Sequence, residues 1–398
     1  MSLHRADTLG GRAAIAGIGA TEFSKDSGRS ELKLAVEAVH AALDDAGLRP
    51  QDVDGLVTFT MDTSPEITVA QAAGIGELSF FSRVHYGGGA ACATVQQAAL
   101  AVATGIAEVV VCYRAFNERS QHRFGVGLTS RQASSEGAAM GWTMPYGLVT
   151  PASWVALHAQ RYLHSYGLSP DVLAPVAVAD RFHAATNPAA YFYRRPITLA
   201  DHAASRWIVE PLRLLDCCQE TDGGQALVVT TSERARDLRH TPALITAAAQ
   251  GAGRNQEAMT SFYRDGLTGL PEMGVVARQL WRTSGLTPAD IDTAVLYDHF
   301  TPFVLMQLEE FGFCGPGEGA AFAAGGRLQL DWSGGDGLPV NTHGGQLGEA
   351  YLHGMNGIAE AVRQLRGSAV NQVPAAQHVL VTAGTGVPTS GLVLSRGR

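Results

Sequence analysis

The chain has 398 residues, of which 46% are hydrophobic and 17% are charged, so it can bury a large core, and its length predicts roughly two or three domains. Its formal net charge is −8 and no run of five basic residues occurs, which argues against binding to nucleic acid or to an anionic membrane. Because the N-terminus lacks an apolar signal core, no run of about 18 apolar residues occurs and the five cysteines show no metal-ligand spacing, we expect a reduced, cytoplasmic protein without a bound metal.

The first part of the chain alternates short apolar runs with segments of helical periodicity. An Ala-rich helix follows a Gly-Gly-Gly turn at 87–89, and Gly105 is expected to end it. Such alternation favours an α/β architecture with mostly parallel sheets that are covered by helices. The expected elements are strands at 13–18, 56–59 and 107–113 and helices at 31–46 and about 91–104.

One motif is written twice. The pattern Gly-Leu-x-Pro-x-Asp-apolar-Asp occurs at 47–54 and again at 285–292, an offset of 238 at every matched position. Each copy follows a helical segment and precedes an apolar strand, which is expected at 294–297 in the second copy. A single repeat over this distance predicts two equivalent α/β halves. The alternative is two unrelated helix–turn–strand units that share a common turn.

The stretch between the two halves is expected to be irregular, and it is rich in aromatic and arginine side chains. Insertions of this kind often form a lid or a substrate surface, although a packing or oligomer surface is equally compatible with the composition. The expected division is an N-terminal half over 1–240, with a loop domain at about 115–240, and a C-terminal half over 241–398.

Residues 341–357 combine glycines with three hydrogen-bonding rings, those of His343, Tyr351 and His353. A glycine-rich turn lets backbone N–H groups approach a ligand closely. The helical segment that follows at 358–365 would direct its positive end to the same place. The pattern therefore predicts a catalytic turn, which glycine and histidine alone do not prove.

This stretch resembles the strand–Gly-Gly–helix segment of thiolases, most closely the sterol-carrier-protein type. Asn341, Gly344 and Gly345 match its Asn-x-x-Gly-Gly pattern, and residues 167–190 and 214–224 are also similar, so the resemblance covers nearly the whole chain. It implies the thiolase fold, an α/β fold of two pseudo-equivalent βαβαβαββ halves in a five-layer αβαβα arrangement with an inserted loop domain.

A thiolase uses a nucleophilic cysteine at a helix start, a histidine in a second loop, the Gly-His-Pro histidine and a late cysteine. At these positions the chain carries Gly88, Tyr297, Tyr351 and an Ala-Gly-Thr-Gly run that ends at Gly386. Two tyrosines at two histidine positions indicate a changed chemistry rather than random decay. Gly88 precludes a covalent acyl-enzyme and is expected to leave space for a substrate carbon beside the thioester.

Acyl-CoA chemistry that needs no nucleophile is retro-aldol cleavage, which requires proton transfer at the β-oxygen and at Cα and a site for the enolate oxygen. Phenols can transfer these protons. A phenol has a pKa of about 10, so a phenolate base near pH 7 costs roughly 4 kcal/mol unless its surroundings lower that value. His299, His343 and His353 are the side chains proposed to lower it.

The tyrosine pattern and the run His-Gly-Gly-Gln-Leu…Tyr-x-His-Gly-Met-Asn are similar to those of lipid-transfer-protein-type, steroid side-chain-cleaving aldolases of the thiolase superfamily. The resemblance implies cleavage of a β-hydroxyacyl-CoA with a tertiary hydroxyl, giving a ketone and a shorter acyl-CoA such as propionyl-CoA. Coenzyme A would enter as part of the substrate, with no other cofactor. The resemblance also implies a homodimer through the first half and a complex with an OB-fold and zinc-ribbon protein that often carries or binds a hydratase.

We assign Tyr297 and Tyr351 as the proton-transfer pair and leave open which of them is the base. Possible supporting residues orient the pair or shape its loops, while Asp298 is expected to cap a helix and Glu349 to face solvent or the turn. The supporting residues are His343, His353, His299, Gly345 and Gly386.

Two other functions stay open. Cys92 lies near the start of the same helix as Gly88 and would serve as the nucleophile of an acetyl-CoA acyltransferase or thiolase, although a small core residue is the plainer reading. The other alternative is a non-catalytic subunit that binds acyl-CoA or lipid.

Overall fold

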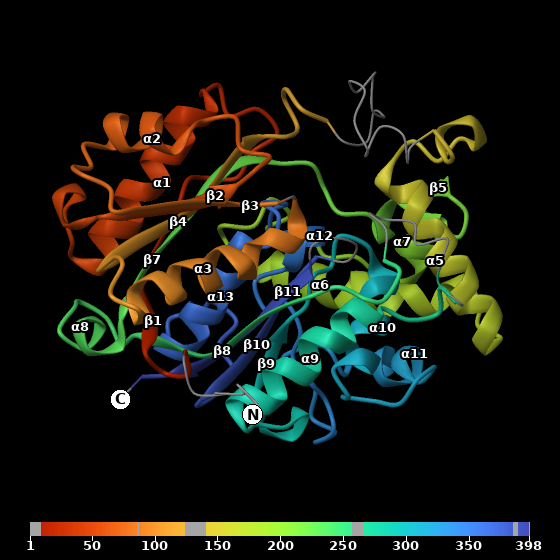
Figure 1. The fold of residues 1–398 in the computed structure, drawn as a ribbon. Helices are drawn as coiled ribbons and strands as arrows, with labels where there is room; N and C mark the ends of the chain where they lie inside the picture. Colours follow the sequence, from red (N-terminus) through yellow and green to blue (C-terminus); the bar gives the residue numbers. More distant parts are fainter. Residues whose placement is uncertain are drawn as a thin grey trace.

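The computed structural model describes residues 9–85, 87–123, 141–256, 264, 266–384 and 389–397. Within these residues, nine strands form one twisted sheet in the order β3-β2-β4-β7-β1-β8-β11-β10-β9 (Figure 1). Its strands are β1 (Ala13–Ala20), β2 (Gly55–Phe59), β3 (Phe80–Val84), β4 (Val109–Asn117), β7 (Asp222–Thr231), β8 (Ala243–Gly251), β9 (Thr293–Val295), β10 (His378–Ala383) and β11 (Thr389–Arg396).

The sheet consists of two halves that join where β1 pairs with β8, through Ala14 opposite Leu244 and Ile15 opposite Ala243. The prediction of mostly parallel sheets was wrong. Within the described nine-stranded sheet, β2 is parallel to β3 and β4, and β9 is parallel to β10, whereas the other five pairings are antiparallel. The reason is that only the connections through helices return the chain in the same direction, while each half ends in strands that reverse it.

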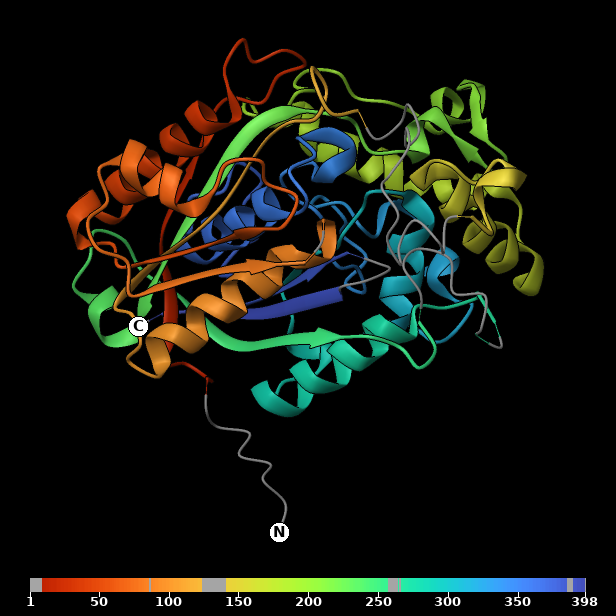
Figure 2. The ribbon, with the colours of Figure 1, turned by 45° about the horizontal axis from the view of Figure 1, so that its top comes forward.

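Helices cover both outer faces of the folded sheet and fill the space between its two halves (Figures 1 and 2). The five-layer αβαβα arrangement of the thiolase fold is thereby confirmed, with separate apolar clusters in the middle and on the two outer sides. One outer layer holds α1 (Glu31–Ala46) and α2 (Glu66–Ala73), the middle layer holds α3 (Ala91–Ala103) and α13 (Met355–Arg366), and the other outer layer holds α9 (Pro271–Ser284) and α10 (Thr301–Glu310).

The middle helices differ from the outer ones because they are enclosed by sheet on two sides. The sequence of α3 is built mainly of small apolar residues, and its side chains pack against strands of both halves. This close packing explains why an Ala-rich segment is stable here, since small side chains let a helix fit between two sheets.

The repeated motif has the same structure in both halves. The glycines that end α1 and α9, Gly47 and Gly285, adopt positive φ angles of 76° and 72°. The first aspartates, Asp52 and Asp290, accept hydrogen bonds from backbone N–H groups three residues earlier, each at 2.8 Å.

The second aspartate of each copy links its strand to the neighbouring parallel strand. Asp54 accepts N–H bonds from Glu108 and Val109 at the start of β4, at 2.9–3.0 Å. Asp292 does the same for Gln377 and His378 at the start of β10, at 2.7 and 2.9 Å. The motif therefore organises two equivalent halves rather than one shared turn.

The insertion is more regular than expected. Its described part is largely helical, and β7, which was expected to lie in the irregular region, is a central strand of the sheet. The helices of the insertion pack against one another and against α10. Because this packing stabilises them, they form even though the local sequence shows no clear helical pattern. The elements are α5 (Pro151–Tyr166), α6 (Ala174–Thr186), α7 (Leu199–Ala204), β5 (Trp207–Val209) and β6 (Leu212–Arg213), and shorter helices elsewhere are α8 (Ser232–Arg236), α11 (Gly319–Ala323) and α12 (Gly345–Gly348).

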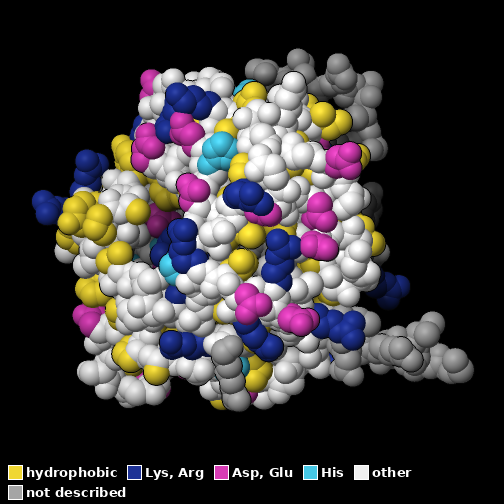
Figure 3. Space-filling model, turned by 90° about the vertical axis from the view of Figure 1, so that its left-hand side faces the viewer, with side chains coloured by type: hydrophobic (Ala, Val, Ile, Leu, Met, Phe, Trp, Pro, Cys, Tyr) yellow, Lys and Arg dark blue, Asp and Glu magenta, His cyan; other side chains and the backbone are white. Residues whose placement is uncertain are grey.

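The surface that carries α1, α2 and α8 shows Lys and Arg side chains interspersed with Asp and Glu, and its hydrophobic side chains occur in small groups (Figure 3). This face therefore has no extended surface of a single electrostatic charge. In the part of the chain that the structure describes, no helix has the length and hydropathy that a membrane crossing requires.

Candidate active site

Tyr297 follows directly after β9, and three contacts hold its backbone in place. Its N–H donates to Oγ1 of Thr382 at 2.9 Å and to Oε1 of Gln307 at 3.3 Å, and Nε2 of Gln307 donates to its carbonyl oxygen at 2.9 Å. Gln307 lies on α10 and Thr382 on β10, so the end of the strand is fixed to two neighbouring elements. The ring of Tyr297 is buried, with 3% of its surface exposed.

Tyr351 reaches the same place from the turn before α13. Its hydroxyl oxygen lies 3.1 Å from that of Tyr297, within hydrogen-bonding distance. Its backbone N–H donates to Oγ1 of Thr221 at 3.0 Å, which ties the turn to the start of β7. The structure thus brings together the two phenols that the sequence assigned to proton transfer, and their catalytic role remains a prediction.

Gly88 lies directly beside this pair, in the short turn before α3. A Cβ atom built on Gly88 would overlap the hydroxyl of Tyr297. On the opposite side of the ring, a Cβ built on Gly354 would lie 3.3 Å from it. The expectation that Gly88 leaves open space for substrate is therefore corrected, because the phenol of Tyr297 fills the position of the missing nucleophile.

The two phenols are neutral at rest. Burial raises the pKa of Tyr297 and of Tyr351 well above the ordinary value, and for Tyr351 the neighbouring Tyr297 adds to the effect. The hydrogen bond with Tyr351 offsets only part of the rise at Tyr297. A neutral phenol is a ready proton donor, and it accepts a proton only while it passes its own proton on.

His299 and His353 do not lower the pKa of these phenols, contrary to the expectation from the sequence. Burial lowers the pKa of His299 to about 3, and burial together with the charge of Arg114 holds the pKa of His353 well below its ordinary value. Both rings are therefore uncharged near pH 7, and a neutral ring offers no positive charge to a phenolate. Their rings nevertheless lie close to the pair, with centroids 4.7 Å apart for His299 and Tyr297 and 4.8 Å apart for His353 and Tyr351.

The helix-capping role expected for Asp298 is confirmed. Its carboxylate accepts the N–H groups of Gln346 at 2.9 Å and Leu347 at 3.0 Å, at the start of α12. A Cβ built on Gly345 would overlap the same carboxylate, so Gly345 permits this cap and packs against Asp298. Gly386 lies outside the described residues.

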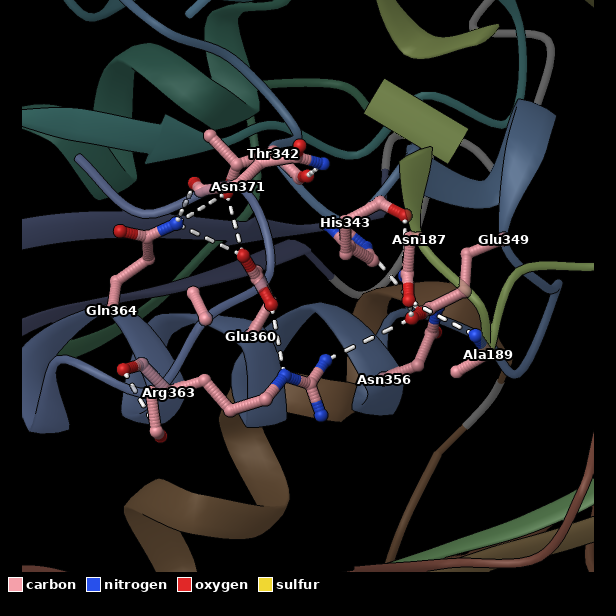
Figure 4. Close-up of polar contacts among 12 residues, drawn as sticks. Asn187, Ala189, Thr342, His343, Glu349, Asn356, Glu360, Arg363, Gln364 and Asn371 are labelled. Atoms are coloured by element: carbon pink, nitrogen blue, oxygen red, sulfur yellow. Dashed lines mark hydrogen bonds and ion pairs between the residues drawn. The ribbon is translucent and has the colours of Figure 1, made fainter. Parts of the chain in front are cut away.

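His343 belongs to a buried polar network that contacts the turn at 341–357 (Figure 4). Glu349 is its centre and is 1% exposed, so of the two expected alternatives the solvent-facing one was wrong, and Glu349 faces the turn through His343 and Asn356. Its carboxylate accepts N–H bonds from Asn187 at 3.1 Å and Asn356 at 2.8 Å and lies 3.8 Å from Nη2 of Arg363 and 3.9 Å from Nε2 of His343.

This network joins three parts of the chain. Asn187 ends α6 of the insertion and donates to the carbonyl oxygen of His343 at 2.9 Å, while Asn356 and Arg363 lie on α13. The backbone of Glu349 also accepts the N–H of Tyr191, at 3.0 Å. Because Tyr351 follows Glu349 by two residues, the network supports the turn that positions the phenol.

We expect Glu349→Gln to destabilise the fold by about 1–3 kcal/mol, because its NH2 group would face the amide donor of either Asn187 or Asn356 and because the change would remove one of the two carboxylates near Arg363, which keeps only Glu360. Thermal unfolding measures the change. The same substitution at the exposed Glu77 is the control and should leave the unfolding temperature unchanged. Equal stability of the two variants would show that the network does not hold the turn.

The sequence analysis missed two buried side chains near the pair that can carry charge. Glu118 is 2% exposed with Oε2 unpartnered, and burial raises the pKa of its carboxyl group well above the ordinary value. Arg114 is fully buried on β4 and donates to His353. A signal was present for Arg114, since a lone arginine in the apolar run Val-Val-Val-Cys-Tyr-Arg-Ala-Phe marks a charge that must be paired inside the protein.

Cys92 has the surroundings of a core residue. It is fully buried on α3, its Sγ lies 3.7 Å from the carbonyl oxygen of Val381, and burial strongly raises the pKa of its thiol. A thiolate nucleophile requires the opposite, a lowered pKa and access to substrate. Among the described residues, no group of three or more His, Cys, Asp or Glu side chains is placed to hold a metal ion.

Comparison with known families gives two matches that together span most of the chain. Residues 13–233 match the model described as thiolase, N-terminal domain, and residues 253–396 match the thiolase C-terminal domain-like model. Human mitochondrial 3-ketoacyl-CoA thiolase has the same fold, with a TM-score of 0.69 at 15% identity over 98% of this chain and 100% of its own.

Three similar proteins are much nearer in sequence. The steroid side-chain-cleaving aldolase of Thermomonospora curvata is 68% identical over 98% of this chain and 99% of its own length. The 17-hydroxy-3-oxo-4-pregnene-20-carboxyl-CoA lyase of Mycobacterium tuberculosis is 66% identical over 97% and 100%. A solved structure named Ltp2-ChsH2(DUF35) aldolase has a TM-score of 0.93 and 67% identity over 98% of this chain and 100% of that chain.

Proposed function

We propose that this chain, which belongs to the thiolase family and within it to the steroid side-chain-cleaving aldolases, cleaves a β-hydroxyacyl-CoA by a retro-aldol reaction in which Tyr297 and Tyr351 move the proton. The observation that carries the proposal is the hydroxyl pair, 3.1 Å apart, beside the glycine that stands at the nucleophile position. A thiolase needs a sulfur atom there, and the nearest cysteine along the chain, Cys92, is buried with a raised pKa.

The two neutral phenols form a relay that needs no resting phenolate. One phenol accepts the proton of the substrate β-hydroxyl while it donates its own proton to the second phenol, and in the same movement the second phenol releases its own proton towards Cα, so each phenolic oxygen keeps one proton throughout. The Cα–Cβ bond breaks, the β-carbon becomes a ketone, and the bonding electrons pass through enolate character on the thioester to the new Cα–H bond. Both phenols end as they began, and the reaction balances without a cofactor.

The substrate class follows from the relatives. The lyase of M. tuberculosis is named for 17-hydroxy-3-oxo-4-pregnene-20-carboxyl-CoA, and we propose this steroid thioester as the substrate here. Its hydroxyl is tertiary and lies on C17, the β-carbon, while C20 is the α-carbon. Cleavage of the C17–C20 bond gives a 17-ketosteroid and propionyl-CoA, with coenzyme A serving as part of the substrate.

The test is incubation of the protein with this thioester in D2O, followed by mass spectrometry of both products. The relay predicts equal amounts of ketosteroid and propionyl-CoA, with one solvent deuterium at Cα of the propionyl group. Free coenzyme A should not be consumed. Cleavage that depends on added free coenzyme A would instead indicate thiolysis and would overturn the proposal.

Replacement of Cys92 by Ala separates the aldolase from an acyltransferase that uses this cysteine. We expect the variant to keep full cleavage activity and to lose about 1 kcal/mol of stability, because a small buried side chain is shortened. Steady-state rates and thermal unfolding measure both effects. Loss of all activity in a folded variant, or an acyl group found on Cys92 by peptide mass spectrometry, would favour the acyltransferase.

We propose a homodimer that forms through the first half of the chain. In the described sheet, β3 is an outer strand that pairs only with β2, and an unpaired strand edge can pair with a second copy. Phe81 on β3 is 59% exposed and Ile67 on α2 is 69% exposed, which supports an apolar contact here. We expect Phe81→Asp to yield a folded monomer in light-scattering measurements, whereas Ile106→Asp, also at an exposed apolar residue, should leave the dimer intact.

We further propose a complex with an OB-fold and zinc-ribbon protein, and the name of the similar solved structure, which pairs Ltp2 with ChsH2(DUF35), supports a second protein in the complex. Co-expression and joint elution in size-exclusion chromatography test this pairing. A cytoplasmic location is proposed as well, supported by five cysteines that are all free thiols, as a reducing compartment would keep them.

A further inference from the structure

A buried ion pair ends on the histidine beside the phenols. Asp62, in the turn after β2, pairs with Nη1 of Arg114, and both side chains are at least 95% buried. Nε of Arg114 donates to Nδ1 of His353 at 3.2 Å. A chain of contacts therefore runs from Asp62 through Arg114 to His353, two residues after Tyr351.

This contact determines which nitrogen of His353 carries the proton. A guanidinium group can only donate hydrogen bonds, so Nδ1 must present its lone pair. A neutral imidazole has one N–H, which must then be on Nε2. The adjacent charge of Arg114 also disfavours a second proton on the ring, so Nε2–H is a neutral donor.

The Nε2 edge of His353 faces the glycine turn of the active site. A Cβ built on Gly87 would lie 3.3 Å from Nε2 and 3.2 Å from Cδ2 of this ring. The next residue, Gly88, contacts the hydroxyl of Tyr297. The Nε2–H group and the hydroxyl of Tyr297 therefore lie beside two consecutive glycines of the same turn, of which Gly88 stands at the nucleophile position.

The ring of His353 is held in one orientation. Its centroid lies 6.2 Å from that of Phe59, 6.3 Å from that of Phe116 and 4.8 Å from that of Tyr351. Its backbone has a φ of 53°, which is uncommon for a residue other than glycine and fixes the direction of the side chain. A donor fixed in this way loses little entropy when it binds an anion.

We propose that Nε2–H of His353 donates a hydrogen bond to the thioester oxygen as the enolate forms, and that Asp62 and Arg114 are positioning residues that keep the proton on Nε2. The inference rests on the proposed retro-aldol function and adds to it the group that stabilises the enolate oxygen. The charged and titratable groups that face His353 in the described residues include Arg114 from β4, with Asp62 behind it, His299 from the loop after β9, and Tyr351 from its own turn.

Two coenzyme A derivatives test this role without turnover. S-(2-nitroethyl)-CoA in its nitronate form carries negative charge on oxygen as the enolate does, and S-propyl-CoA carries none. We expect His353→Asn, which tolerates the positive φ but is too short to place a donor at Nε2, to weaken nitronate binding about 100-fold and to leave S-propyl-CoA binding unchanged. His353→Gln, whose amide reaches the Nε2 position, should recover most of the loss.

The pH dependence of cleavage tests the positioning pair. In the double variant Asp62→Asn/Arg114→Met, His353 is free to carry its proton on either nitrogen, so cleavage at pH 8 should fall about tenfold. Loss of the Arg114 charge removes one of the causes that lower the pKa of His353 while burial still lowers it, so the ring gains a second proton only at a pH well below its ordinary value; there both nitrogens donate, and activity should recover as the pH falls into that acidic range. The wild-type protein should show no such recovery.

The outcomes separate this inference from the proposed function. Equal losses for both ligands in His353→Asn, no rescue by Gln, or a pH-independent loss in the double variant would overturn the donor role and indicate a structural one. Selective loss of nitronate binding would support the donor role even if neither tyrosine proved necessary for cleavage, because the binding assay involves no proton transfer by the phenols.

Discussion

Tyr297→Phe is expected to lower the rate of steroid thioester cleavage by about 10²–10⁴-fold, the range in which a positioned acid or base contributes. The substitution removes one hydroxyl and keeps the ring, whose backbone is held by Gln307 and Thr382. Stability should fall by only about 1 kcal/mol, since a single hydrogen bond is lost. Pre-steady-state cleavage rates and thermal unfolding of the purified variant measure the two effects.

Tyr351→Phe should have an effect of the same size, because a relay fails when either member is removed. The double variant should then be no slower than either single variant, as residues that act as one unit have non-additive effects. Tyr146→Phe, at a tyrosine that is 81% exposed, is the matched control and should keep the wild-type rate. If both single variants retained full activity, the protein would be a binding subunit or would use other groups.

Gly88→Ala is expected to abolish cleavage to the level of Tyr297→Phe, although it adds one methyl group to a residue that takes no part in the chemistry. That methyl would overlap the hydroxyl of Tyr297, so the phenol must move away from Tyr351. Filling a packed site in this way typically costs about 1–3 kcal/mol of stability. Cleavage rates and unfolding temperatures again measure the outcome.

Two further variants isolate the steric cause. Gly88→Ala/Tyr297→Ala removes the clash, so it should be more stable than Gly88→Ala combined with Tyr297→Phe, whose ring atoms still overlap the new methyl, and it should remain inactive. Gly76→Ala, at a glycine with open space where its Cβ would lie, should change neither stability nor rate. An active Gly88→Ala variant would show that the position of the Tyr297 hydroxyl is not critical.

Gly88→Cys is not expected to restore thiolase chemistry, because it would cause the same steric overlap with Tyr297. Its Cβ would occupy the space of the Tyr297 hydroxyl, and the histidines that a thiolase uses to activate sulfur are absent from the two loops. The change from sulfur to phenol chemistry therefore involves coupled positions. The glycine is required by the tyrosine, and the tyrosine excludes the nucleophile.

The fold could be predicted largely from local patterns. The structure of the motif at 47–54 and 285–292 follows from its own residues. The glycine adopts a positive φ, the first aspartate caps the turn, and the second aspartate accepts hydrogen bonds from the neighbouring strand. The insertion and the antiparallel pairings were not predictable in this way. The structure of the insertion and the strand pairings depends on which distant segments pack against one another in the folded protein. A short window of sequence does not contain this information.

In the candidate site, too, some features could be predicted from the sequence and others could not. The resemblance to thiolases indicated Tyr297 and Tyr351, because the family's motifs mark the positions at which the nucleophile is missing and two histidines are replaced. The sequence alone left open whether Glu349 faces solvent or the turn, and it suggested phenols with lowered pKa values. The solvent-facing alternative and the lowered pKa values both failed because they depend on burial, which is a property of the assembled core.

By itself, the sequence determined two α/β halves, the loss of the sulfur nucleophile and the presence of two phenols in its place, because turn chemistry, apolar periodicity and residue identity are local. Only the tertiary structure decided that the phenols meet at Gly88, that His353 presents Nε2–H and that the nearby histidines are uncharged. These properties arise from contacts between residues that are distant in the chain and from the exclusion of water around them.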